Sequence, residues 1–178
     1  FETYQKILAE AMEELGFETG ISSRSSGDNF VSDCTIETDQ LALIPDSYID
    51  MTAEKIRIYK ELDSLTSEKD LINMKNRLTD RFGKMPVELE RLFDIVRIRQ
   101  LGQKLGFEKI IIKNGVMIAF FITNPLSQYY RSDRFSKVLE NVNLNPKLFE
   151  IKQPDGRLRI MVRNVDGISK AYDILKKL

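Results

Sequence analysis

The chain has 178 residues, of which 42% are hydrophobic and 30% are charged, with 27 basic and 27 acidic side chains that cancel. This composition is that of an ordinary soluble globular protein, and its longest apolar run, Val116 to Ile122, is too short to span a bilayer. Balanced charge also weighs against a dedicated nucleic-acid module, because phosphate contacts normally require a basic excess.

Residues 1–34 divide into an amphipathic segment and a polar linker. Phe1 to Leu15 places apolar side chains at helical spacing, so we predict a helix over residues 1–17. Residues 18–34 are rich in Ser, Gly, Asp and Asn, and this composition predicts a flexible linker before the main domain. The chain begins inside a helical pattern without an initiator Met, so we expect it to be a part of a longer protein.

Residues 35–106 are predicted to form a mainly helical half. Thr35 to Ile44 has the pattern of a strand or extended segment, ended by Pro45. Apolar stripes then predict three helices, over Thr52–Leu65, Ser67–Phe82 and Pro86–Leu105. Ser67 is placed to cap the second helix by accepting a hydrogen bond from the N3 amide, and Gly83 to end it at positive φ.

Residues 107–178 change to the two-residue period of strands. Two hairpins are predicted, one around the turn Asn114-Gly115 and one around Pro154-Asp155-Gly156. An amphipathic helix follows each hairpin, over Asp133–Asn143 and from a cap at Asp166 onward. We therefore predict an α+β fold: a three-helix subdomain followed by two ββα units, which form an antiparallel sheet with both helices on one face.

Side chains that common catalytic sites need are missing. The sequence has no His and a single cysteine, Cys34, which excludes catalytic triads, His-containing zinc motifs and an internal disulfide. Cys34 falls in the predicted linker, where we expect an incidental thiol, and a lone cysteine fits a cytoplasmic location. Neither glycine-rich nucleotide fingerprint is present. We expect no catalytic, cofactor or metal residues in this chain.

Aromatic and basic side chains combine just before the predicted helix at Asp133. As a site, Tyr129, Tyr130, Arg131 and Arg134 would stack on bases or anchor a protein partner. As structure, the tyrosines would pack at the edge of the sheet while Ser132 or Asp133 caps the helix.

Two further groups of charged residues have a structural and a functional interpretation. Arg157, Arg159 and Arg163 share one face of a predicted strand, which is either a solvated face or a DNA contact. The third helix carries charged residues at i,i+3 and i,i+4 spacing, which we interpret as surface ion pairs: Glu90, Arg91, Asp94 and Arg97.

An ordered set of short motifs resembles the C-terminal domain of the bacterial transcription-repair coupling factors. The motifs are Ile44-Pro45-Asp46-Ser47-Tyr48-Ile49, Tyr59-Lys60, Arg81-Phe82-Gly83 with Pro86, and Leu105-Gly106. The likeness runs from about Thr35 to the C-terminus, and Phe1 to Phe17 resembles the helix that leaves the motor region of those proteins. Lys55-Ile56 and Glu61 depart from the Arg-Leu and Arg expected there.

The resemblance implies a non-catalytic, autoinhibitory domain of an ATP-dependent, helicase-like DNA translocase that displaces stalled RNA polymerase and recruits nucleotide excision repair. It implies that the domain docks on a UvrB-like N-terminal module and masks the surface that binds UvrA. ATP and Mg²⁺ would belong to the motor domains of the parent protein. RNA polymerase and double-stranded DNA would be bound through the parent, with no membrane involved.

Two other functions remain open from the residues alone. The first is a nucleic-acid-binding accessory domain of a DNA translocase, which would use residues 107–178 and the cluster from Tyr129 to Arg134. The second is a small enzyme with carboxylate chemistry.

Overall fold

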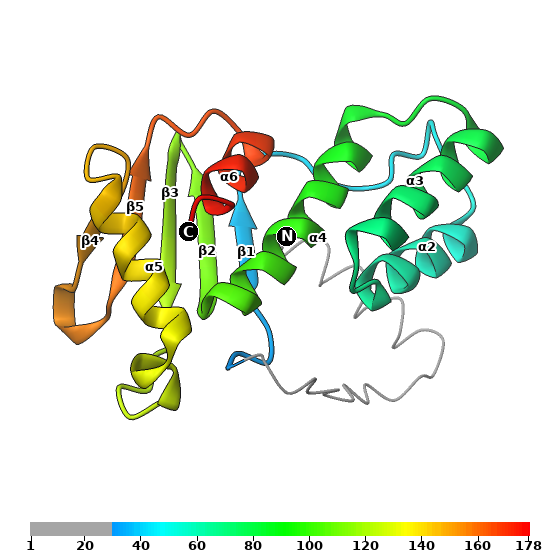
Figure 1. The fold of residues 1–178 in the computed structure, drawn as a ribbon. Coiled ribbons are helices and arrows are strands. Elements are labelled where there is room, and N and C mark those ends of the chain that lie inside the picture. The colour runs from blue at the N-terminus through cyan, green and yellow to red at the C-terminus, as the bar shows by residue number, and fades with distance from the viewer. Residues whose placement is uncertain (1–29) are drawn as a thin grey trace. The chain divides into compact units, whose positions relative to one another are not determined.

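The computed structural model describes residues 30–178, which contain five α-helices and five strands and confirm the α+β class (Figure 1). The described residues divide into two compact units. The helical unit is Leu41–Arg97, and the sheet unit combines residues 30–40 with Ile98–Leu178. The helix predicted over residues 1–17 and the linker predicted over residues 18–34, except its last five residues, lie outside the described part.

The helical unit consists of α2 (Thr52–Ser64), α3 (Glu68–Phe82) and the first part of α4 (Val87–Leu105). Each predicted helix is confirmed to within two residues at its ends. Their stripes meet in one core with side chains no more than 5% exposed, formed by Ile44, Ile49, Ile58, Tyr59, Leu62, Leu71, Met74, Leu78, Met85, Leu89, Leu92, Phe93 and Val96. Burial of these apolar side chains is what holds the three helices together.

Both predicted end signals of α3 are present. The Ser67 hydroxyl accepts a hydrogen bond from the Asp70 amide at 3.1 Å, and Gly83 ends the helix at φ +88°. The Tyr48 hydroxyl lies 3.1 Å from the carbonyl oxygen of Leu78 and 3.0 Å from that of Gly83. Tyr48 therefore supplies a donor to the carbonyl end of α3, where intrahelical partners run out.

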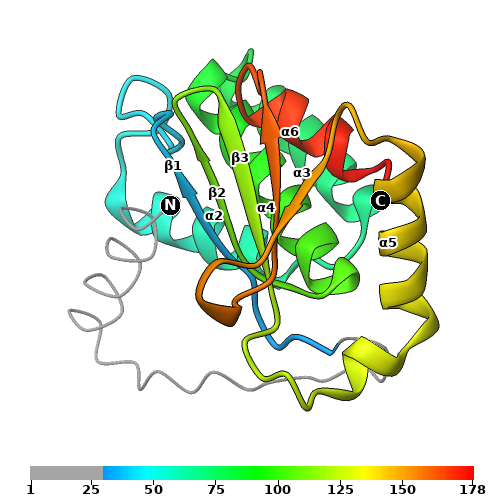
Figure 2. The ribbon, with the colours of Figure 1, turned by 90° about the vertical axis from the view of Figure 1, so that its left-hand side faces the viewer.

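The sheet unit is built on five strands in the order β1-β2-β3-β5-β4 (Figure 2). Their bounds are Thr35–Thr38, Phe107–Lys113, Val116–Phe121, Glu150–Lys152 and Arg159–Arg163 for β1 to β5. Both predicted hairpins are confirmed, because β2 pairs antiparallel with β3 and β4 with β5. The strand β3 also pairs antiparallel with β5, which joins the two hairpins into one sheet.

The strand β1 corrects two details of the predicted architecture. It pairs parallel with β2, so the sheet is mixed and not wholly antiparallel. Residues 30–40 and the end of α4 also belong to the sheet unit, whereas the predicted division placed residues 35–106 together in the helical half. The physical reason is that Ile36 is fully buried in the sheet, paired with Ile110 more than seventy positions away.

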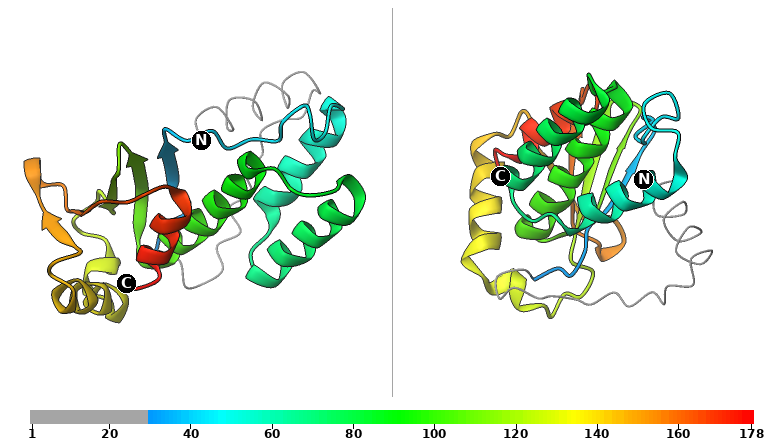
Figure 3. Two further views of the ribbon diagram at one scale, coloured as in Figure 1. Left: turned by 90° about the horizontal axis from the view of Figure 1, so that it is seen from above. Right: turned by 90° about the vertical axis from the view of Figure 1, so that its right-hand side faces the viewer.

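The helices α5 (Asp133–Leu144) and α6 (Ile168–Leu175) cover the same face of the sheet, as predicted (Figure 3). The strand side chains beneath them are almost fully buried: Ile36, Ile110, Ile112, Met117, Ala119, Phe121, Ile160 and Val162.

The cap predicted at Asp166 is wrong. The N-cap of α6 is Gly167, at φ +90°, and the Gln40 side chain accepts a hydrogen bond from the Ile168 amide at 3.2 Å. A residue distant in sequence thus satisfies a helix donor that Asp166 was expected to satisfy.

Candidate interaction surfaces

Tyr129, one of the four predicted partner-binding residues, is buried with no exposed surface. It lies in the 3₁₀ turn η1 (Gln128–Arg131), and its hydroxyl donates to the Leu105 carbonyl oxygen. Its ring lies 5.3 Å from that of Phe135 and 6.1 Å from that of Phe121, centroid to centroid. The structural alternative is therefore the correct one for Tyr129, which cannot contact a partner in the folded domain.

The remaining three residues of that predicted site differ in accessibility. Tyr130 is half-buried and donates to the Ile122 carbonyl oxygen, while Arg134 donates to that of Lys104. Arg131 is exposed at the end of η1. Ser132 caps α5 by accepting from the Phe135 amide at 3.3 Å. Contact of Tyr130, Arg131 and Arg134 with a partner stays a prediction.

Packing around Tyr129 explains why glycine follows Leu105. Gly106 has φ +90°, a conformation that L side chains rarely adopt. A Cβ atom at this position would lie 2.2 Å from two atoms of the Tyr129 ring. The pair Leu105-Gly106 therefore ends α4 and makes room for the aromatic ring that locks η1 to it. The motif Leu105-Gly106 gave no indication of this contact, because Tyr129 lies far from it along the chain.

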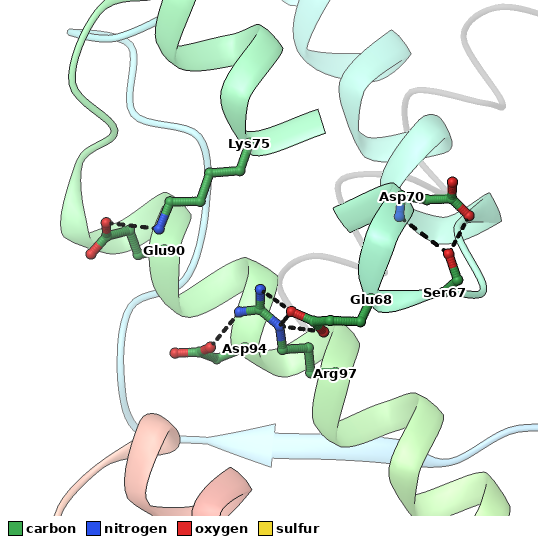
Figure 4. Close-up of polar contacts among 7 residues, drawn as sticks. All are labelled: Ser67, Glu68, Asp70, Lys75, Glu90, Asp94 and Arg97. Atoms are coloured by element: carbon green, nitrogen blue, oxygen red, sulfur yellow. Dashed lines mark hydrogen bonds and ion pairs between the residues drawn. The ribbon is translucent and has the colours of Figure 1, made fainter. Parts of the chain in front are cut away.

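Within the helical unit, Arg97 of α4 joins two carboxylates (Figure 4). Its guanidinium makes a two-point contact with Glu68 at the start of α3, with Nε 2.9 Å from both carboxylate oxygens, and lies 3.0 Å from Asp94. The Arg97 side chain is only 17% exposed. A second ion pair, between Lys75 and Glu90 at 3.3 Å, also links α3 to α4 but is open to solvent.

Electrostatics support a structural role for the Arg97 cluster. Burial raises the pKa of Asp94, although the hydrogen bond from Arg97 opposes the rise. Burial also disfavours the charge on Arg97, but Glu68 and Asp94 together outweigh it and raise the pKa of the guanidinium. Arg97 thus stays charged and fixes the start of α3 against α4, so the predicted surface pairs are partly contacts between helices.

Three features of the described residues bear on thiol chemistry, metal binding and membrane spanning. Burial raises the pKa of the Cys34 thiol far above its ordinary range, and the side chain is fully buried, so the thiol is inaccessible in the folded domain. Between residues 30 and 178, no three His, Cys, Asp or Glu side chains are placed to hold a metal ion. No helix in this part is both long and apolar enough to cross a membrane.

A cavity of about 420 Å³ opens in the sheet unit beside the end of β3. Tyr130, Gln153 and Arg157 contribute side chains to it, and Asp155 is the sole carboxylate among its lining residues. The lining thus combines one acidic side chain, Asp155, and one basic side chain, Arg157, with uncharged residues.

Comparison with known proteins relates the chain to one protein family. Residues 38–132 match the sequence model of the TRCF domain. A transcription-repair-coupling factor of Staphylococcus epidermidis is 33% identical over 92% of this chain and 12% of its own length. One of Rickettsia typhi is 31% identical over 98% of this chain and 14% of its own length. The chain thus spans a small part of the curated relatives that it matches.

A solved structure shares the fold. The crystal structure of the C-terminal domain of a transcription-repair coupling factor superposes with a TM-score of 0.66, covering 82% of this chain and 88% of that one. Sequence identity in this match is 17%, so the likeness shows a common fold.

Proposed function

Since this chain belongs to the TRCF domain family of the transcription-repair coupling factors, we propose that it is the C-terminal regulatory domain of such a factor and inhibits it by docking within the same protein. In this proposal the domain binds a UvrB-like N-terminal module and hides the surface that recruits UvrA. Engagement of the parent with stalled RNA polymerase then releases the domain. ATP hydrolysis with Mg²⁺ and translocation on double-stranded DNA are activities of other parts of the parent.

The observation that carries the proposal is the family match over residues 38–132. Support comes from how the domain uses its clustered polar groups. Arg97 is engaged between two helices, Tyr129 is buried against α4, and the Cys34 thiol is inaccessible. A domain whose conspicuous polar groups are internal acts through its surface, which fits a docking module better than an enzyme.

A docking equilibrium of modest size is sufficient for inhibition. A free-energy difference of about 2.7 kcal/mol between docked and released states hides the partner-binding surface about 99% of the time. A short tether supplies an effective concentration of about 1 mM, so the same contact made between separate molecules would have a Kd of about 10 µM. Such an interaction is weak enough to be released by a competing partner.

The test is binding in trans. The parent protein, truncated before Thr35, is titrated with this chain by isothermal calorimetry at one salt concentration. Saturable binding in the micromolar range is the expected result. Absence of binding to the truncated parent would defeat the proposal. Salt-dependent binding to duplex or single-stranded DNA in that situation would favour the nucleic-acid-binding accessory domain instead.

A further inference from the structure

The second face of the sheet carries an apolar centre. Strand side chains alternate between the two faces, so the residues that alternate with the buried strand positions point away from α5 and α6. The register aligns Ile111, Ile118 and Met161 in one row across β2, β3 and β5. Val116 and Phe120 extend this row along β3, and all five side chains are half-buried. No helix of the described sheet unit covers them (Figures 2 and 3).

A basic rim surrounds this apolar centre. The outward positions that are paired in the strand register hold five cations, Lys109, Lys113, Lys152, Arg159 and Arg163, and two carboxylates, Glu37 and Glu150. Glu108 has no partner in this register, because it lies where the β2 register shifts. The chain as a whole has equal numbers of basic and acidic side chains, so the excess on this face is local. We refer to these residues with the apolar row as the outer sheet face.

Ion pairs within the outer sheet face do not neutralise its excess of positive charge. Glu37 is shared by Lys109 and Lys113, and Glu150 by Lys152 and Arg163. The Lys113 and Arg163 side chains remain 44% and 60% exposed.

Arg159, at the start of β5 in the basic rim, has an unsatisfied donor. Its Nε is buried and has no hydrogen-bond partner among the residues that the structure describes. Its guanidinium carbon lies 5.8 Å from the centroid of the Phe120 ring, and that of Arg157 lies 4.7 Å from the same centroid. Buried donors normally have a hydrogen-bond acceptor, so Arg159 Nε lacks the carboxylate or carbonyl partner that such a group usually has.

We propose that the outer sheet face binds an acidic amphipathic helix of a partner protein. A sheet face with an apolar row is ordinarily covered by a helix, whose own apolar stripe completes the layer. Glutamate or aspartate along the flanks of that helix would meet Lys113, Arg163 and the guanidinium group of Arg159. An apolar centre with a charged rim is also the anatomy of protein–protein interfaces.

The same observations argue against single-stranded nucleic acid as the occupant. Platforms for single strands stack successive bases on several aromatic side chains. The outer sheet face has one aromatic residue, Phe120, whose ring is already covered by Arg157. The other four residues of the apolar centre have no aromatic ring on which a base can stack.

The probe is a synthetic helical peptide of about 20 residues, with leucines at i, i+3, i+4 and i+7 spacing flanked by glutamates. A matched peptide has lysine in place of each glutamate. We expect the acidic peptide to bind this chain, with amide chemical-shift changes on β2, β3 and β5, and to bind more weakly as salt is raised. The lysine peptide should bind at least about tenfold more weakly, a difference of about 1.4 kcal/mol.

Two variants assign the contact to the outer sheet face. Arg159→Glu should weaken the acidic peptide by about tenfold or more, and Ile118→Thr should do so while keeping a β-branched residue in the strand. The control, Lys170→Glu, reverses an exposed charge on α6, on the other face of the sheet, and should leave binding unchanged. Urea unfolding of each variant checks that it folds. If Ile118→Thr does not fold, Arg159→Glu alone provides the test.

Several results would overturn the proposal. They are equal binding of the two peptides, no loss of affinity in Arg159→Glu, or shift changes confined to α5 and α6. Binding of an oligothymidylate that competes for the same face would assign the surface to nucleic acid instead. These experiments use this chain alone and do not depend on docking within the parent. Their results therefore neither support nor contradict the proposed function.

Discussion

Replacing Gly106 by Ala should strongly destabilise the sheet unit. The added Cβ would lie 2.2 Å from the Tyr129 ring, and φ at this position is +90°. Tyr129 cannot turn aside, because it is fully buried and its hydroxyl donates to the Leu105 carbonyl oxygen. An alanine at positive φ costs about 1–2 kcal/mol, and forcing an extra methyl into a packed core costs about 1–3 kcal/mol. We therefore expect a loss of about 2–5 kcal/mol.

Urea unfolding followed by circular dichroism measures this loss. A small domain has a denaturant slope of about 1–3 kcal/mol per M in urea, so the midpoint should fall by about 1 M or more. The matched control is Gly115→Ala in the β2–β3 turn, where φ is +72° but nothing lies within 4 Å of the added Cβ. It should show the backbone cost alone. Equal losses for the two variants would refute the inferred contact with Tyr129.

Three further predictions concern single side chains. Arg97→Ala should cost about 1–3 kcal/mol, because it leaves the half-buried Asp94 carboxylate without its ion-pair partner. Lys75→Ala should cost less than about 1 kcal/mol, and equal urea midpoints of the two variants would contradict this. Cys34 should react with a thiol reagent only when the fold opens, so fast labelling of the native chain would contradict the burial of this thiol. Hydrogen bonds from Lys109 lower the pKa of Glu37, so the loss of stability in Glu37→Gln should be present at neutral pH and vanish as pH falls below about 4.3. A loss that persists in acid would argue against that ion pair.

Local signals in the sequence were enough to place most elements. Ser67 and Gly83 mark the two ends of α3 because capping depends on residues within a few positions of the helix end. Asn114-Gly115 marks the β2–β3 turn for the same reason, since both residues adopt positive φ there. Each of these features is decided by chain geometry over a handful of residues.

Features that depend on residues far apart in the chain could not be predicted from local sequence patterns. The parallel pairing of β1 with β2 and the capping of α6 by Gln40 join segments far apart in the chain. The same holds for Arg97, whose spacing from Asp94 indicated a surface pair while its stronger partner, Glu68, lies on another helix. Tyr129 was predicted to contact a partner, but its ring is buried. That burial comes from Gly106 and from surrounding aromatic residues, which the local sequence pattern does not reveal.

UvrA binding by the parent protein tests the proposed inhibition most directly. Three samples are compared at one salt concentration: the full-length parent, the parent truncated before Thr35, and the truncated parent with this chain added in trans. If docking hides the surface about 99% of the time, truncation should raise the apparent affinity for UvrA about 100-fold. Addition of the chain should partly reverse that gain, because the tether no longer concentrates it. Equal UvrA affinity of the full-length and truncated proteins would contradict the proposed inhibition.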